Sequence, residues 1–250
     1  MKKLLVLKNI DREGPGLFQK VAKEKGFLPE IYNLSLGDEL PEPKKDDLIL
    51  IMGGPMGVRD INNKKYFWLR EETKFIKRAI ENKIHIIGVC LGAQLLAHIL
   101  GGKIVPLKDE LNIANKPELG WSDIFSLSEK YNDISNLRIK EPLKVLHWHG
   151  DRIILPAQAD LLASSVRCKE QFFKIGDNIF GLQFHIETVG LMTDEWIEND
   201  KKFIISGLGQ NGQKILINQC KEFGSSTLTK RVLFIEKLFN KIIEQKKTSC

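Results

Sequence analysis

The sequence has few cysteines and no long apolar run, and each shortage excludes a class of protein. Its four cysteines, Cys90, Cys168, Cys220 and Cys250, are dispersed over 250 residues. This spacing fits neither a disulfide framework nor a metal-ligand pattern, so we expect reduced thiols. No apolar stretch approaches the roughly 18 residues of a membrane-spanning helix, so we expect no membrane association.

The sequence also lacks a block of one charge and an export signal. The formal net charge is +6, and it comes from lysines spread along the chain, so nucleic-acid binding is not indicated. Lys2 and Lys3 precede an apolar run at 4–7 that Lys8 ends. This run is too short for the core of a signal peptide and predicts a first strand, which favours a cytoplasmic location.

Apolar runs and helix-period segments alternate in the first hundred residues. We interpret the runs at 4–7, 31–34, 48–52 and 84–89 as strands, because they have the length and composition of buried strands. The alternation predicts an α/β fold with a doubly wound, mostly parallel sheet. Ligands bind such sheets beyond the carboxyl ends of the strands, so the turn at 53–57 and Cys90 should face one cleft.

The pattern changes after Gly102. Short β-like runs, separated by turn residues at hairpin-like intervals, predict an antiparallel extension of the sheet. They lie at 104–107, 121–127, 144–147, 153–155, 161–166, 172–175 and 179–187. From Met192 the pattern is helical, with an apolar stripe between 232 and 243 that favours core packing over a partner surface. We expect one domain over 1–190 and a helical C-terminal extension over 191–250, packed on it.

A glycine-flanked cysteine stands where an expected strand gives way to an expected helix. The run at 84–89 leads into a G-x-C-x-G motif centred on Cys90, and a helix-period segment follows. Such a turn is the cysteine form of a nucleophile elbow, which lifts one side chain clear of the sheet edge. A helix N-terminus also favours the thiolate. The competing interpretation is a small buried cysteine without chemistry.

His185 and Glu187 supply the base that a thiol nucleophile needs. Residues two apart on a strand point to the same side, so we expect the two side chains to be neighbours. A carboxylate fixes the tautomer of such a base. The competing interpretation is a solvated histidine at a strand end. His147 and His149, which flank Trp148, form a second candidate pair.

Four motifs, taken together and in order, resemble those of the class I glutamine amidotransferases. They are Gly53-Gly54-Pro55, the cysteine motif at 88–94, His149-Gly150-Asp151 and the histidine motif at 181–187. The likeness is greatest to the glutaminase domain of GMP synthase and its free-standing relatives, and it covers residues 1–190. It implies a flavodoxin-like core and attack by a cysteine on the side-chain amide of glutamine.

The resemblance implies a role for each motif residue. Cys90 would attack the amide, His185 would act as base and then as acid, and Glu187 would orient His185. A γ-glutamyl thioester would form, and water would release glutamate. Backbone N–H groups of Gly54 and Leu91 would hold the oxyanion, and such donors are typically worth about 10²–10³ in rate each.

Substrate binding and the fate of the ammonia follow from the same resemblance. Gln94 would contact the substrate, whereas its competing interpretation is an exposed helix residue. Gly150 and Asp151 would help to hold the α-amino and α-carboxylate ends. No metal or organic cofactor is implied. GMP synthase uses an ATP-pyrophosphatase domain to consume the ammonia, and this sequence shows no such domain and no G-x-x-x-x-G-K-[ST] loop. Any ammonia acceptor would therefore be a separate synthase subunit.

Three functions stay open at the level of sequence. The first is a glutamine amidotransferase or glutaminase. The second is a γ-glutamyl peptidase or hydrolase, which uses the same thioester chemistry on another γ-glutamyl compound. The third is a catalytically silent scaffold of the same fold. Retention of Cys90, His185, Glu187, Gly54 and Gln94 together disfavours the third.

Overall fold

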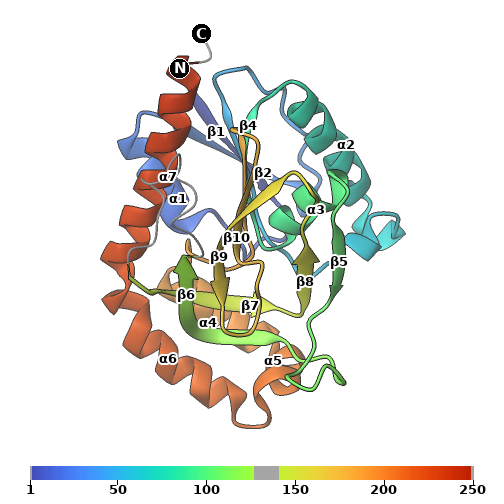
Figure 1. Cartoon of the computed structure of the whole chain (residues 1–250), viewed down its shortest axis with the longest axis vertical. Coiled ribbons are helices and arrows are strands. Elements are labelled where there is room, and N and C mark those ends of the chain that lie inside the picture. The colour runs from blue at the N-terminus through green and yellow to red at the C-terminus, as the bar shows by residue number, and fades with distance from the viewer. Residues whose placement is uncertain (1, 127–140, 249–250) are drawn as a thin grey trace.

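The computed structural model describes residues 2–126 and 141–248, so residue 127 of one expected strand and Cys250 lie outside the described residues. Within these ranges a nine-stranded sheet runs through the molecule in the order β2-β1-β3-β4-β11-β10-β9-β6-β7. Helices cover both of its faces (Figure 1). The α/β class expected from the sequence is confirmed.

One half of the sheet is parallel. Its strands are β2 (Leu28–Asn33), β1 (Lys3–Lys8), β3 (Leu48–Ile51), β4 (His85–Val89) and β11 (Ile179–Leu182). β3 and β4 are buried along their whole length, as expected for strands with helices on both sides. The second strand begins earlier than the expected run at 31–34, because it is an edge strand with several partly exposed residues and a weak apolar signal.

The other half is antiparallel, as expected, but three of the runs assigned to it lie elsewhere. The run at 179–187 contributes β11, which pairs parallel with β4, and the runs at 104–107 and 153–155 form a separate sheet. The antiparallel half consists of β10 (Phe172–Ile175), β9 (Ala159–Ser165), β6 (Glu118–Ser126) and β7 (Leu143–His149). A separate two-stranded sheet pairs β5 (Lys103–Pro106) with β8 (Asp151–Ile154).

The prediction that His185 and Glu187 lie on a regular strand is wrong. β11 ends at Leu182, and His185 forms only an isolated bridge with Leu146 of β7. The chain leaves the side of β4 there and crosses toward β7, where the N–H of His185 donates to the carbonyl of Leu146 at 2.8 Å. The two side chains nevertheless lie together, with Nδ1 of His185 2.7 Å from Oε1 of Glu187.

Each face of the sheet is covered by its own set of helices (Figure 1). α1 (Gly16–Glu24) and α7 (Leu228–Thr248) share one core cluster, and α2 (Trp68–Glu81) and α3 (Leu91–Ile99) share the other. Short 3₁₀ turns occupy Leu34–Leu36, Val58–Asp60 and Lys64–Tyr66. The stripe on α7 is confirmed as core-facing, because Ile235, Leu238, Phe239 and Ile242 are all buried.

Three further helices gather at the end of the sheet drawn at the bottom of Figure 1. They are α4 (Gly190–Asn199), α5 (Lys201–Leu208) and α6 (Gly212–Ser226). Trp196, Ile204 and Leu216 of these helices pack with Trp121 and Trp148 in a third core cluster. Among the described residues, no helix has both the length and the apolar character to cross a bilayer.

Candidate active site

Cys90 sits in a strained turn between β4 and α3. Its backbone has φ +51° and ψ −106°, a conformation that a residue with a side chain rarely adopts. The N–H of Cys90 donates to the carbonyl of Leu182 at 2.8 Å, and the N–H of Gln94 donates to the carbonyl of Cys90 at 3.0 Å. These contacts hold the turn, and the side chain lines a cavity.

Gly88 and Gly92 let α3 lie directly against the sheet. A Cβ on Gly88 would lie 2.5 Å from the carbonyl carbon of Gly92, and a Cβ on Gly92 would collide with the carbonyl oxygen of Ile51. Because larger residues cannot take either place, the two flanking glycines act as the elbow motif predicts.

His185 lies between a carboxylate and the cysteine. Its Nδ1 lies 2.7 Å from Oε1 of Glu187. Its Cε1 and the Cβ of Cys90 both lie within 3.3 Å of the place that a Cβ on Gly53 would take. Burial opposes protonation of the ring, but the charges of Glu187 and Cys90 and the hydrogen bond to Glu187 hold the pKa of His185 well above its ordinary value. The structure therefore brings Cys90, His185 and Glu187 together.

Two residues of the C-terminal helices support this arrangement, and the sequence reasoning missed both. Trp196 of α4 packs edge-on against the ring of His185, with the ring centroids 4.8 Å apart. Arg231 of α7 is buried and donates to the carbonyls of Ile186 at 3.0 Å and Thr188 at 2.7 Å, on either side of Glu187. Burial lowers the pKa of Arg231 to about 10, although the charge of Glu187 opposes this shift.

The cavity beside Cys90 has a volume of about 440 Å³. The other predicted site residues that line it are His185, Gly54, Leu91, Gln94, Gly150 and Asp151, whereas Glu187 lies behind His185. The exposed-residue interpretation of Gln94 is wrong, since its side chain is only 4% exposed and its amide donates to Oε1 of Gln183 at 3.2 Å. Leu91 is the first residue of α3, where a backbone N–H has no acceptor within the helix.

Residues that the sequence analysis did not single out complete the cavity wall. Asp200, Phe203 and Ser206, which lie in or next to α5, face the cavity. Arg12 from the loop after β1 forms an ion pair with Asp200 at 2.7 Å, and the indole of Trp148 donates to the same carboxylate at 3.1 Å. The C-terminal helices are thus joined to the cavity by charged contacts across long sequence separations.

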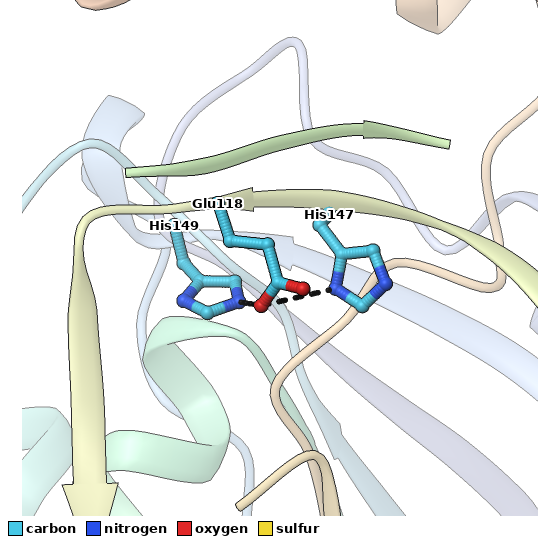
Figure 2. Close-up of side chains that lie close together, drawn as sticks. All are labelled: Glu118, His147 and His149. Atoms are coloured by element: carbon cyan, nitrogen blue, oxygen red, sulfur yellow. Dashed lines mark ion pairs between the residues drawn. The ribbon is translucent and has the colours of Figure 1, made fainter. Parts of the chain in front are cut away.

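A second histidine–carboxylate cluster lies in the antiparallel half (Figure 2). Nε2 of His149 and Nδ1 of His147 lie 3.2 Å and 3.7 Å from Oε2 of Glu118. Over residues 2–126 and 141–248, these three are the residues whose potential ligand atoms lie within 4.8 Å of one another, a spacing that a metal ion can use. The second candidate base pair, His147 and His149, therefore belongs to this cluster, and of the two only His149 reaches the cavity.

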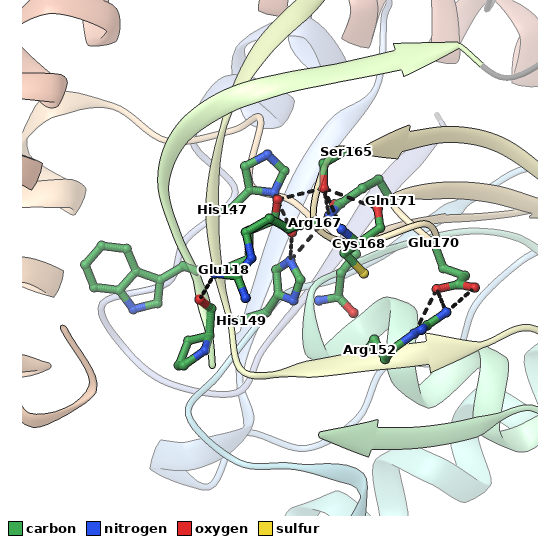
Figure 3. Close-up of polar contacts among 12 residues, drawn as sticks. Glu118, His147, His149, Arg152, Ser165, Arg167, Cys168, Glu170 and Gln171 are labelled. Carbon is green, nitrogen blue, oxygen red and sulfur yellow. Dashed lines mark hydrogen bonds and ion pairs between the residues drawn. The ribbon is translucent and has the colours of Figure 1, made fainter. Parts of the chain in front are cut away.

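Hydrogen bonds already fill the acceptor positions of Glu118 (Figure 3). Ser165 donates to Oε1 at 2.6 Å, and the amide of Gln171 donates to Oε2 at 2.8 Å. His149 donates through Nδ1 to the carbonyl of Asp151 at 2.9 Å. The amide nitrogen of Gln171 also lies 3.5 Å from Nε2 of His149, so this amide occupies the side from which a metal would approach the cluster.

The charges of the cluster are set by burial and by its own members. Burial acts to raise the pKa of Glu118, but the hydrogen bond from His149 and the charges of both histidines hold it at about 2. Burial lowers the pKa of His147 to about 4, against the attraction of Glu118. Glu118 is therefore ionised and His147 neutral near pH 7.

A nucleophile elbow opposite a histidine–carboxylate pair, on a doubly wound sheet, defines a class of α/β proteins built for cysteine chemistry. The model of the family "Glutamine amidotransferase class-I" matches residues 20–203. This protein therefore belongs to the class I glutamine amidotransferase family.

Similar proteins span most of the chain. The glutamine amidotransferase-like protein YfeJ of Salmonella typhimurium is 29% identical over 201 residues, which cover 79% of this chain and 81% of that protein. One subunit of the glutamine-hydrolyzing GMP synthase of Sulfolobus acidocaldarius is 34% identical over 187 residues, covering 74% of this chain and 89% of that one. The crystal structure of a glutamine amidotransferase from Thermotoga maritima superposes with a TM-score of 0.79 at 25% identity, over 96% of this chain and 97% of that chain.

Proposed function

We propose that this protein hydrolyses the side-chain amide of glutamine through a γ-glutamyl thioester on Cys90. One observation carries the proposal: a single imidazole, that of His185, lies beside Cys90 and bonds to Glu187 at 2.7 Å, at a cavity large enough for an amino acid. A thiol, a base and an orienting carboxylate are the groups that acyl transfer to a cysteine requires.

The chemistry begins with the thiolate. The sulfur of Cys90 attacks the amide carbon, and the C=O electron pair moves onto oxygen. When the tetrahedral intermediate collapses, the C–N bond breaks and His185 gives its proton to the nitrogen, which leaves as ammonia. Water then gives a proton to His185 and attacks the thioester, and the C–S bond breaks to release glutamate and restore the thiolate. Glu187 keeps the ring oriented throughout.

The remaining site residues bind the substrate and the oxyanion. The backbone N–H groups of Gly54 and Leu91, which both line the cavity, are the proposed oxyanion donors. Gln94 contacts the bound substrate, and Gly150 and Asp151 hold the charged α-end of the amino acid. No step of this scheme needs a metal or an organic cofactor.

The fate of the ammonia is a separate part of the proposal. The similar protein of Sulfolobus acidocaldarius is, by its name, one subunit of a glutamine-hydrolyzing GMP synthase. We propose by analogy that an acceptor on a separate protein consumes the ammonia.

Mass spectrometry of Cys90 tests the proposal. The protein is incubated with glutamine and a panel of γ-glutamyl peptides and quenched in acid, and the mass of the Cys90 peptide is compared with the ammonia or amine released. We expect a γ-glutamyl adduct on Cys90 that Cys90→Ser abolishes. Cys168→Ser is the matched control, because burial raises the pKa of Cys168 to about 12 and leaves that thiol unreactive.

The same panel separates the alternative functions. Turnover of γ-glutamyl peptides far above that of glutamine would replace the glutaminase by a γ-glutamyl peptidase with the same triad. No adduct with any compound, or an adduct on another cysteine, would overturn the thioester proposal and leave the silent scaffold.

A further inference from the structure

Glu13 is a buried acid at the site that the proposed mechanism does not use. It lies in the loop between β1 and α1, its side chain lines the same cavity as Cys90 and His185, and the residue is only 7% exposed. The loop is held by the N–H of Glu13, which donates to the carbonyl of Ile10 at 3.3 Å. Sequence reasoning passed over it because a single acid in a loop carries no pattern.

The carboxyl group of Glu13 points at the reacting groups. Oε2 of Glu13, Cε1 of His185 and Cβ of Cys90 all lie within 3.3 Å of the place that a Cβ on Gly53 would take. Gly53 has no side chain, so these groups from three separate segments converge there. Glu13 is therefore on the side of the cavity where the nucleophile and the proton donor meet.

The carboxyl group has no hydrogen-bond partner within the part of the chain that the structure describes. Its charged neighbour Arg12 is instead paired with Asp200 at 2.7 Å. Burial raises the pKa of Glu13 to about 7, although the charges of His185 and Arg12 oppose this shift. A buried carboxyl group that lacks a protein partner and faces a cavity is suited to bind a ligand there.

We infer, on the basis of the proposed function, that Glu13 is a catalytic residue that binds the leaving nitrogen of the substrate: its carboxylate accepts a hydrogen bond from an N–H of the scissile amide while His185 delivers the proton. The nitrogen has to lie next to His185 to receive that proton, and Glu13 lies next to His185. The α-ammonium group of glutamine is several bonds away from the reacting carbon, so it is the less suitable partner.

This contact strengthens during the reaction. A planar amide nitrogen carries weakly acidic N–H groups, whereas the nitrogen of the collapsing intermediate becomes a protonated amine with positive charge. A carboxylate therefore stabilises the transition state more than the bound substrate, which is the requirement for catalysis. The proton count is unchanged, because Glu13 accepts only a hydrogen bond.

The substrate class follows from the same contact. Glu13 assists leaving groups that keep an N–H, such as the ammonia of glutamine or the primary amine of a γ-glutamyl peptide. It gives no assistance to an ester, whose leaving oxygen brings no N–H to the carboxylate. Glutamine and the γ-methyl ester of glutamate share the γ-glutamyl group and the thioester, so they differ in the step that the inference concerns.

The test compares kcat/KM for glutamine and for this ester in the wild-type protein, Glu13→Met and Glu13→Gln. Methionine keeps the volume and removes the acceptor, and we expect kcat/KM for glutamine to fall by about 10- to 100-fold, the worth of one hydrogen bond to a charged group. We expect kcat/KM for the ester to change less than about threefold, since the lost bond does not form with it. Glutamine at residue 13 retains a carbonyl acceptor and should give an intermediate loss.

Two further measurements guard against a structural effect. Glu24→Met, at the exposed end of α1, is the matched control and should leave both substrates unaffected. Thermal melting and the rate of Cys90 alkylation report the fold and the Cys90–His185 pair in each variant. Equal losses for amide and ester in Glu13→Met would overturn the inference, as would unchanged turnover of glutamine. If the wild-type protein turned over the ester but not glutamine, the inference would be overturned while the thioester chemistry would stand. If it turned over neither substrate, both the proposed function and the inference would be overturned.

The pH dependence gives an independent readout. Protonation of Glu13 weakens its acceptor, so kcat/KM for glutamine should lose activity in wild type below about pH 7, and this limb should be absent for the ester and in Glu13→Met. The groups that face Glu13 and influence its charge come from four segments: Arg12, Cys90, His185, Glu187 and Asp200. An identical acid limb in Glu13→Met would assign the titration to one of them and contradict the inference.

Discussion

Two histidine–carboxylate pairs lie beside the strand β7, and they differ in what surrounds them. His185 and Glu187 lie 2.7 Å apart beside the cavity, and Oε2 of Glu187 has no hydrogen-bond partner among the described residues. In the antiparallel half, both oxygens of Glu118 accept hydrogen bonds and the cluster is closed by Ser165 and Gln171. The imidazole of the first pair thus lines the cavity with Cys90 and its carboxylate keeps one oxygen unpaired, whereas the carboxylate of the second accepts hydrogen bonds on both oxygens.

The difference teaches how the same two residue types can serve chemistry or structure. A buried ion pair whose acceptor positions are all filled has none left for a substrate. Removing one partner leaves the other charge unpaired. The ring of His185 lies beside Cys90 and can move a proton. In return, one oxygen of Glu187 is left without a hydrogen bond. We therefore expect matched substitutions in the two pairs to have opposite consequences.

The largest expected effect is on catalysis by His185 and Glu187, which we call the open pair. Glu187→Gln keeps the shape of the side chain but fixes the wrong tautomer of His185, and kcat for glutamine should fall by about 10⁴-fold. Steady-state ammonia release measures the loss, and the melting temperature should shift by only a few degrees. A variant that retains a tenth of the wild-type kcat would contradict the orienting role of Glu187.

The next largest effect is on the stability that Glu118 and His149, the closed pair, contribute. Glu118→Gln removes the buried carboxylate to which Ser165 and Gln171 donate, so the free energy of unfolding should fall by about 3–5 kcal/mol. For a chain of this size that corresponds to a melting temperature lowered by about 10 °C, measured by calorimetry or circular dichroism.

The control for this second prediction is Asp123→Asn, which removes one partner of a more exposed ion pair with Lys144 and should cost under about 1 kcal/mol. Zinc titration of the wild-type protein belongs to the same experiment. Stoichiometric zinc binding that Glu118→Gln abolishes would mean that the cluster is a metal site and that the comparison between the two pairs is mistaken.

A smaller effect on catalysis is expected from Arg231, which supports the pair of His185 and Glu187. Arg231→Gln removes charged hydrogen bonds to the carbonyls on both sides of Glu187, so kcat/KM should fall about 10- to 100-fold while Cys90 stays in place. Lys230→Gln, one residue away, breaks only an exposed ion pair with Glu141 and is the matched control. Equal activity in the two variants would show that α7 does not hold the base.

The smallest effect concerns the pH dependence of stability. His147 has a pKa of about 4 in the folded protein against 6.5 for the free group, so unfolding takes up a proton and stability falls as the pH drops from 6.5 to 4. His147→Gln should remove about 1–3 kcal/mol of this loss. The loss due to Glu118, whose folded pKa of about 2 makes its stabilisation disappear below pH 4.5, should persist.

Urea unfolding at pH 7, 5 and 4 measures this difference between wild type and His147→Gln. Parallel curves for the two proteins across that range would show that His147 titrates normally and that the cluster is less buried than the structure has it.

The elements predicted correctly are those with a local signal. The glycines two residues before and after Cys90 indicate the elbow. Apolar runs that alternate with helix-period segments indicate the parallel strands in the first hundred residues. The neighbourhood of His185 and Glu187 was also correct, although the strand assigned to them was not. The two side chains are in contact even though the regular pairing of β11 has ended before them.

The residues that were missed act over long distances in the sequence. Arg231 reaches the carbonyls around Glu187 from more than forty positions later, and Glu13 reaches Cys90 from a loop at the other end of the chain. Only the fold makes these contacts visible. Arg231 did leave a trace, since it lies on the same helix face as Ile235, Leu238 and Ile242, where a charged residue requires a buried partner.

The position of Arg231 in the chain sets the order in which a nascent protein can assemble its chemistry. Cys90, His185 and Glu187 have all been synthesised before α7 emerges. The carbonyls of Ile186 and Thr188 have no hydrogen bond from Arg231 until α7 has been made. A growing chain on the ribosome therefore holds the segment around His185 and Glu187 without its anchor. Translation has to pass α7 before this segment has all the contacts that the folded protein gives it.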